Sequence, residues 1–121
     1  MNKFEAEVSV LVRELGLDCR EQFRMGRRKW GAERRVDLLV TETATRRRIG
    51  IECKFQNGSG SADEKIFATI EDIKAWPIPG IVVLGGAGFS ESMERYLVGS
   101  GAAVLFEDLD QWLRLFFRLD L

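Results

Sequence analysis

The 121-residue sequence contains no histidine. This absence excludes the serine and cysteine hydrolases that use a histidine base, the zinc hydrolases that use histidine ligands, and the nucleases that activate water with histidine. Any general base must therefore be a carboxylate, a lysine or a water molecule bound to a metal. Any metal must be a hard cation that is held by oxygen ligands.

Cysteines and long apolar runs are also scarce. The two cysteines, Cys19 and Cys53, form no CxxC pattern, so neither a disulfide nor a zinc site is expected. No run approaches the roughly 18 consecutive apolar residues of a membrane span. Glu5 and Glu7 lie where a secretory signal peptide would be apolar. We therefore expect a cytoplasmic protein without membrane association, folded as one domain over residues 1–121.

Positive charge is concentrated in one part of a chain whose net charge is −1. Residues 20–54 contain eleven Lys or Arg and five Asp or Glu, whereas residues 55–121 contain five and ten. The basic residues cluster within 23–35 and 45–50. Such a patch on an otherwise acidic protein suggests an anionic partner, most simply a nucleic-acid backbone. The alternative is a solvated loop and a charged turn.

Hydrophobic periodicity and capping signals predict a regular alternation of elements. In chain order they are a helix over 2–15, strands over 17–25, 34–41 and 47–56, a helix over 61–76, a strand over 80–86, a helix over 90–99, a strand over 102–106 and a helix over 107–119. The fully apolar strand over 80–86 is typical of a buried parallel strand. This order predicts an α/β fold with a mixed sheet and helices on both of its faces.

The segment IGIECKFQNG, residues 49–58, carries charged side chains in a strand that otherwise has the apolar residues of a buried strand. Alternation at period two places Glu52, Lys54 and Gln56 on one face. The short turn before this strand makes the previous strand its antiparallel neighbour, which brings Asp37 near Glu52. Two converging carboxylates suit Mg²⁺. The alternative is a cluster of ion pairs on a solvated sheet face, which contributes little to stability.

These residues resemble the motif of the PD-(D/E)XK nuclease superfamily. Val36-Asp37 corresponds to the PD half, with valine in place of the usual proline, and Glu52-Cys53-Lys54 to the (D/E)XK half. The predicted element order is similar to the αβββαβ core of that restriction-endonuclease-like fold, with an additional C-terminal strand and helix. The resemblance implies a metal-dependent DNA endonuclease that hydrolyses phosphodiester bonds. Asp37 and Glu52 would bind Mg²⁺, with Mn²⁺ as a substitute, and Lys54 would assist the attacking water.

Resolvase-like members of the superfamily add a glutamate from the first helix to the metal site. Helical geometry does not distinguish Glu5 from Glu7, because each lies about 80° from the centre of the apolar stripe at ~100° per residue. The resemblance favours Glu5, which lies about three turns before Gly16. Gln56 occupies a position where relatives carry glutamine, which implies a ligand for water or phosphate. Its alternative is an exposed amide at the strand end.

The basic cluster is expected to contact the phosphates of DNA. The expected contacts are Arg27, Arg28, Lys29, Arg34, Arg35 and Lys65. Trp30 either stacks on a base or caps the edge of the core. The last helix is more apolar than one buried face requires, which fits core packing and also the contact of an expected homodimer. Three alternative functions stay open: a Holliday junction resolvase, an inactive DNA-binding module on the same fold, and an assembly subunit.

Overall fold

The computed structural model describes residues 1–27, 33–58 and 63–120. The elements are α1 (Lys3–Glu14), β1 (Asp18–Arg27), β2 (Glu33–Thr41), β3 (Arg48–Phe55), α2 (Asp63–Lys74), β4 (Gly80–Gly85), α3 (Glu91–Gly99), β5 (Ala103–Leu105), the short 3-10 helix η1 (Phe106–Asp108) and α4 (Leu109–Phe117). Every predicted element is present. Phe106 was expected to end the last strand but begins η1 instead.

The five strands form one mixed sheet in the order β1-β2-β3-β4-β5. β1, β2 and β3 are antiparallel neighbours, because only short connections join them. β4 and β5 run parallel to β3, and α2 and α3 form the crossovers. The predicted α/β fold with a mixed sheet, consistent with a restriction-endonuclease-like core, is therefore confirmed.

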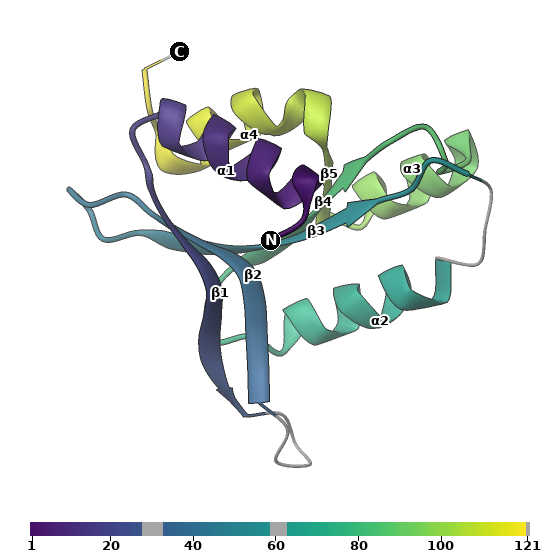
Figure 1. The fold of residues 1–121 in the computed structure, drawn as a ribbon, viewed down its shortest axis with the longest axis horizontal. Helices are drawn as coiled ribbons and strands as arrows, with labels where there is room; N and C mark the ends of the chain where they lie inside the picture. The colour runs from purple at the N-terminus through teal and green to yellow at the C-terminus, as the bar shows by residue number, and fades with distance from the viewer. Residues whose placement is uncertain (28–32, 59–62, 121) are drawn as a thin grey trace.

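Two apolar cores lie on opposite faces of this sheet. α1 and α4 cover one face, and their buried side chains, such as Val8 and Leu113, pack on Ile51 and Val83. α2 and α3 supply the other core, in which Ile70 and Leu97 lie with alternate residues of the same strands. Figure 1 shows α1 and α4 together on one side of the sheet and α2 on the other. No helix within the described residues combines the length and apolarity of a membrane span.

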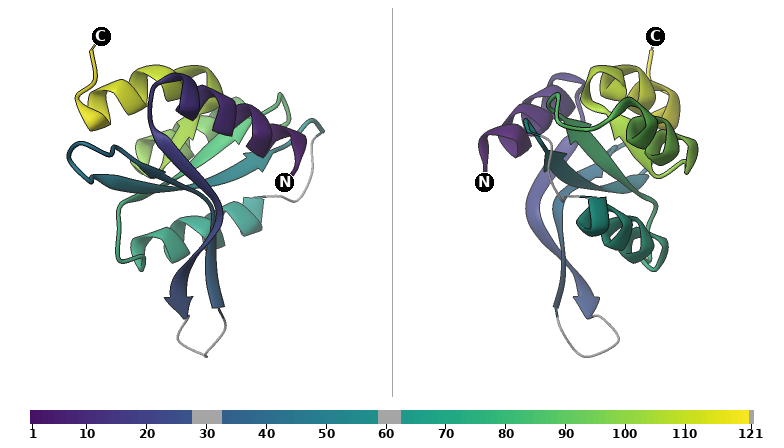
Figure 2. Two further views of the ribbon diagram at one scale, coloured as in Figure 1. Left: turned by 60° about the vertical axis from the view of Figure 1, so that its left-hand side comes forward. Right: turned by 90° about the vertical axis from the view of Figure 1, so that its right-hand side faces the viewer.

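The β1–β2 ribbon leaves the sheet partway along its length. β2 pairs with β3 from Thr41 to Leu38, whereas its pairing with β1 continues to Glu33. β3 meanwhile stays paired with β4 as far as Phe55. Figures 1 and 2 show the far half of the ribbon as an arm that projects away from the helices. The strands β2 and β3 therefore form a fork that opens just beyond Leu38 and Ile51.

Trp76 fixes the position of α2 on the sheet. Its indole lies over Gly50 and Gly80, which face each other across β3 and β4. A Cβ atom would lie 2.6 Å from the Trp76 ring at Gly50 and 2.3 Å from it at Gly80. The Trp76 Nε1–H donates a hydrogen bond to Asp72 Oδ2 at 3.1 Å, which satisfies the polar end of the ring. The two glycines thus provide the space that this helix needs.

The fit between Trp76 and the glycines predicts a specific loss of stability. Gly80→Ala should reduce the free energy of unfolding by about 1–3 kcal/mol, because the buried indole must shift to admit a methyl group. Gly99→Ala is the control, since a Cβ atom at Gly99 meets nothing within 4 Å. Urea unfolding followed by circular dichroism measures both changes. Equal midpoints for Gly80→Ala and the parent protein would contradict this account of α2.

Candidate active site

Asp37 and Glu52 occupy the opening of the fork between β2 and β3. Each lies one residue beyond the last antiparallel pair, Leu38–Ile51. Gly50 faces the ring of Trp76, which follows α2, so alternation along β3 directs Glu52 and Lys54 toward the side of the sheet that α2 covers. The two carboxylates that the sequence placed on adjacent strands therefore come together where those strands separate.

The carboxylates replace the backbone ladder at the fork. Cys53 donates its backbone N–H to Asp37 Oδ2 at 2.9 Å, and Asp37 donates its own to Glu52 Oε1 at 3.3 Å. A buried N–H group without a partner costs free energy comparable to a lost hydrogen bond. The acidic side chains thus satisfy two donors that the diverging strands would otherwise leave without a partner. These hydrogen bonds also hold both carboxylates in fixed positions.

The buried position of Glu52 beside Asp37 changes the ionisation of Glu52. Burial and the negative charge of Asp37 raise the pKa of Glu52 to about 8, and the positive charge of Lys54 partly opposes this shift. A hydrogen bond between the Glu52 and Asp37 side chains raises the pKa of Glu52 further, because it stabilises the protonated form. The pair therefore carries less than two full negative charges at neutral pH unless a cation joins it.

Glu5 and Glu7 have different environments in α1. Glu5 is only 8% exposed, whereas Glu7 is exposed to solvent. Burial, followed by the charge of Asp37, raises the pKa of Glu5, so its carboxylate lies within electrostatic reach of the pair. Asn2 caps the helix by accepting the Glu5 backbone N–H at 2.8 Å, and its amide donates to Glu5 Oε1 at 3.1 Å. The Glu5 carboxylate is therefore held by Asn2.

The donor set suits a hard cation with two protein ligands. Asp37 and Glu52 offer only carboxylate oxygens, and Mg²⁺ is commonly bound by one or two carboxylates, with water and phosphate completing its octahedron. Within the described residues, no group of three His, Cys, Asp or Glu side chains is arranged to hold a metal ion. Glu5 as a third ligand stays a prediction.

Gln22 faces the pair from β1 and was not anticipated. The pairing of β1 with β2 passes from Glu21–Leu38 to Phe23–Val36 and omits Gln22 opposite Asp37. Gln22 has the left-handed φ of 50° there, and its Nε2 lies 3.5 Å from Asp37 Oδ1. Glutamine carries no preference for this conformation, so no pattern in the sequence indicates it. Asn2, in contrast, had a readable signal, since it immediately precedes the apolar periodicity of α1.

Gln56 contacts the loop that follows β4. Its Nε2 donates to the Gly88 carbonyl at 3.0 Å, and Gly88 donates its N–H to the Gln56 carbonyl at 2.6 Å. A Cβ atom at Gly86 would lie 2.4 Å from the Gln56 carbonyl oxygen. The Gln56 Oε1 atom is buried and has no partner among the described residues. These contacts fix the end of β3 beside the carboxylates, whereas a ligand role for this residue stays a prediction.

Cys53, the middle residue of the Glu52-Cys53-Lys54 motif, points into the core under α1. Both Cys53 and Cys19 are buried free thiols. Burial and the charges of Asp37, Glu5 and Glu52 raise the pKa of Cys53, so its thiol stays protonated. A protonated thiol is a poor nucleophile and a poor metal ligand. Cys53 therefore acts as an apolar anchor for β3.

The basic residues expected at the DNA interface divide into two groups. Arg34 is largely buried: it pairs with Asp72 of α2 at 3.3 Å, and its Nη1 donates to the Ala75 carbonyl at 3.3 Å. Arg24 and Arg35 lie on the exposed arm, where both pair with Glu33 at 3.2 Å. Outside the described part of the chain are Arg28, Lys29, Trp30 and the side chains of Arg27 and Lys65. Of the described residues, only Arg35 combines a predicted DNA contact with an exposed side chain.

Comparisons with known proteins agree with this architecture. The family described as the PD-(D/E)XK nuclease superfamily domain matches residues 2–110. Among solved structures, the crystal structure of a protein of unknown function, AF1548, has a TM-score of 0.55 and 19% identity, covering 84% of this chain and 54% of that chain. At this identity the likeness shows the fold alone, and this chain spans about half the length of that protein. No match was found among curated proteins.

The raised pKa of Glu52 predicts that stability falls with pH in metal-free protein. An unfolded glutamate ionises near pH 4.5, whereas Glu52 in the folded state holds its proton until about pH 8. The folded state thus binds more protons across this window, so its stability declines as the pH rises through it. Glu52→Gln keeps the acceptor oxygen for Asp37 but removes the charge. This variant should be more stable than the parent at pH 8, on the order of 1–3 kcal/mol after allowance for solvent screening, and should gain much less at pH 5.

Urea unfolding in EDTA at both pH values measures this difference. Glu7→Gln is the matched control, because it neutralises a glutamate of α1 that is exposed to solvent. A gain for Glu52→Gln that is equal at pH 5 and pH 8 would show that the pKa of Glu52 is not raised in the folded protein.

Proposed function

This chain belongs to the PD-(D/E)XK nuclease superfamily, and we propose that it is a metal-dependent endonuclease that hydrolyses the phosphodiester bonds of DNA. The observation that carries the proposal is the fork between β2 and β3. There Asp37 and Glu52 share a site in which the pKa of Glu52 is raised to about 8, and Lys54 lies on the same side of β3. Two carboxylates held this close favour binding of a cation, because a cation offsets the repulsion between them.

Asp37 and Glu52 would hold the metal, with Mg²⁺ as the physiological ion and Mn²⁺ as a substitute. When bound, the cation would supply Lewis-acid activation of water and stabilise charge on the phosphate. The hydrogen bonds from the Cys53 and Asp37 N–H groups hold both carboxylates in place before substrate arrives. The protein therefore meets the requirement that ligands be positioned by a rigid support.

Lys54 would donate hydrogen bonds to the attacking water or to a phosphate oxygen whose negative charge increases in the transition state. Its ammonium group also favours the ionised form of Glu52, because the positive charge lowers the Glu52 pKa. Glu5 would join the metal site as a third ligand. Gln56 would contribute indirectly, by holding the end of β3 against the Gly86–Gly88 loop, or directly through its buried oxygen.

DNA would approach the fork along the β1–β2 arm, which carries exposed arginines. Arg27, Arg28, Lys29, Arg35 and Lys65 are the proposed phosphate contacts, whereas Arg34 would act mainly by holding α2 to β2. One active site makes one cut in this scheme. Cleavage of both strands would therefore require a homodimer or repeated encounters.

A second candidate function is a DNA-binding module without catalytic activity. The observation that favours it is the lack of a three-donor metal cluster within the described ranges. Such a module would bind DNA in a salt-dependent manner and would not cut it with any divalent metal. A Holliday junction resolvase would instead make two symmetric nicks in a four-way junction.

Cleavage assays test the catalytic proposal directly. The parent protein should nick supercoiled DNA in Mg²⁺ or Mn²⁺ and not in EDTA. Lys54→Ala should reduce the rate by about 100- to 1000-fold, the range for loss of one group that stabilises transition-state charge, with the unfolding midpoint unchanged. Lys74→Ala, which removes an exposed lysine paired with Glu71 on α2, should cut at the parental rate.

Absence of cutting by the parent protein on duplex, single-stranded and four-way-junction DNA would rule out the enzyme. Salt-dependent binding in that case would select the inactive module.

The arm predicts a salt-dependent contribution to DNA affinity. Arg24→Ala combined with Arg35→Ala should weaken binding to any sequence and lower the slope of log K against log salt by about 2. Arg95→Ala, which removes an exposed arginine paired with Glu91 in α3, is the control. Fluorescence anisotropy between low and moderate salt measures the slopes. An unchanged slope for the double variant would place the DNA elsewhere.

A further inference from the structure

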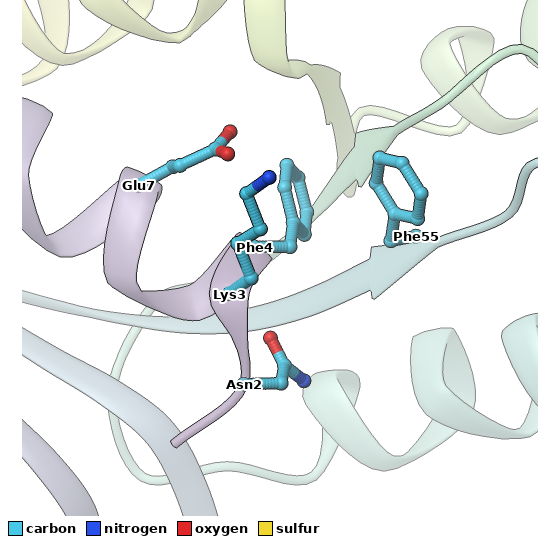
Figure 3. A pocket seen from close by; sticks show the side chains of 5 residues that line it. All are labelled: Asn2, Lys3, Phe4, Glu7 and Phe55. Atoms are coloured by element: carbon cyan, nitrogen blue, oxygen red, sulfur yellow. The ribbon is translucent and has the colours of Figure 1, made fainter.

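We propose that a hollow beside the carboxylates binds a single unstacked nucleobase of the DNA, so that the protein prefers DNA with an unpaired base near the cut. The hollow has a volume of about 350 Å³ and is lined by Asn2, Lys3, Phe4, Glu7 and Phe55. Figure 3 shows side chains from the start of α1 and Phe55 from the end of β3 around this space. This inference rests on the proposed function, because it assigns the DNA that occupies the fork.

Phe55 has the exposure and the support of a stacking platform. Its side chain is 54% exposed, although it lies at the end of a strand whose neighbouring apolar residues are buried. Its ring packs on Phe4 with centroids 5.4 Å apart, and Phe4 packs in turn on Phe106 at 5.5 Å. A Cβ atom at Gly85 would lie 2.4 Å from the Phe4 ring, so that ring is held from below as well. Exposed aromatic rings on rigid supports are the usual platform for unstacked bases.

Two features connect the hollow to the proposed active site. Asn2 lines the hollow, donates a hydrogen bond to the Glu5 carboxylate and accepts one from the Glu5 backbone N–H. Phe55 directly follows Lys54, and this part of β3 pairs with β4 while β2 has already left its other edge. A nucleotide at that open edge could place its phosphate toward Lys54 on one face and its base toward Phe55 on the other.

Charge in and around the hollow favours a base over a phosphate. Glu7 lines the hollow, and an adjoining hollow of about 160 Å³ that shares Phe4, Glu7 and Phe55 also has Glu94 and Glu107 in its wall. These carboxylates oppose an anion, and among the described residues Lys3 is the one cation that lines either hollow. A carboxylate accepts hydrogen bonds from the exocyclic amino group of a base such as cytosine, which thymine lacks. We therefore expect cytosine to be preferred to thymine in the hollow.

Binding without cleavage tests this site independently of the chemistry. Three labelled hairpin duplexes are compared by fluorescence anisotropy in EDTA: one fully paired, one with an unpaired cytosine and one with an unpaired thymine. The parent protein should bind the unpaired cytosine most tightly. Phe55→Ala and Phe55→Leu should weaken binding to that DNA by roughly 5- to 100-fold, the range for loss of one base stack, whereas Phe55→Tyr should bind within about twofold of the parent.

The variants separate stacking from packing. Phe55→Leu keeps an apolar contact with Phe4 but lacks an aromatic face, so affinity equal to that of the parent would overturn the proposal. Phe67→Ala is the control, since Phe67 is an exposed phenylalanine of α2 that pairs with Tyr96 instead. Glu7→Ala should remove the preference for cytosine over thymine. Unfolding midpoints are recorded for every variant.

Failure of this inference differs from failure of the proposed function. A parent protein that cuts DNA and binds all three hairpins equally would overturn the nucleobase site and leave the nuclease intact. A protein that never cuts but prefers the unpaired cytosine, and loses that preference with Phe55→Leu, would keep the site and remove the enzyme.

Discussion

The separation of β2 from β3 beyond Leu38 and Ile51 is the constraint on which the rest of the site depends. Diverging strands leave backbone N–H groups without a ladder, and such groups must find other partners when water is excluded. The Asp37 and Glu52 carboxylates fill this need at 2.9 and 3.3 Å. The same two hydrogen bonds thus satisfy these backbone N–H groups and fix the two acids side by side.

The cost of this solution is electrostatic. Burial and the negative charge of Asp37 destabilise the ionised form of Glu52, and its pKa rises to about 8 in consequence. At physiological pH the free energy of unfolding is therefore lower than it would be if both side chains were neutral. Strain at functional positions is commonly retained where it serves binding or catalysis, and the left-handed backbone of Gln22 lies at this same point. A bound cation would relieve the repulsion that the fold by itself creates.

Several features of this site could be read from the sequence because they depend on local rules. The period-two alternation of residues 49–56 and the short turn before them placed Glu52 across from Asp37, and the two are in contact. The helix that ends before Gly16 put both Glu5 and Glu7 near its start, but only packing against the sheet decides which of them is buried. Gln56 was expected on the strand face that carries Glu52 and Lys54, but β3 ends at Phe55 and the Gln56 side chain bonds to Gly88, more than thirty residues later in the chain. Arg34, expected on the DNA-binding surface, instead lies against α2.

The sequence by itself determined the order of the elements, the absence of histidine as a ligand or base, and the spacing of the acidic motif. These properties follow from short-range preferences and from residue identity, which a linear pattern contains. Tertiary structure alone decided where the strands part, which glutamate of α1 is buried, and how Phe4, Phe55 and Phe106 gather beside the carboxylates. Those arrangements are sums of many weak contacts between distant segments, so no single stretch of the chain encodes them.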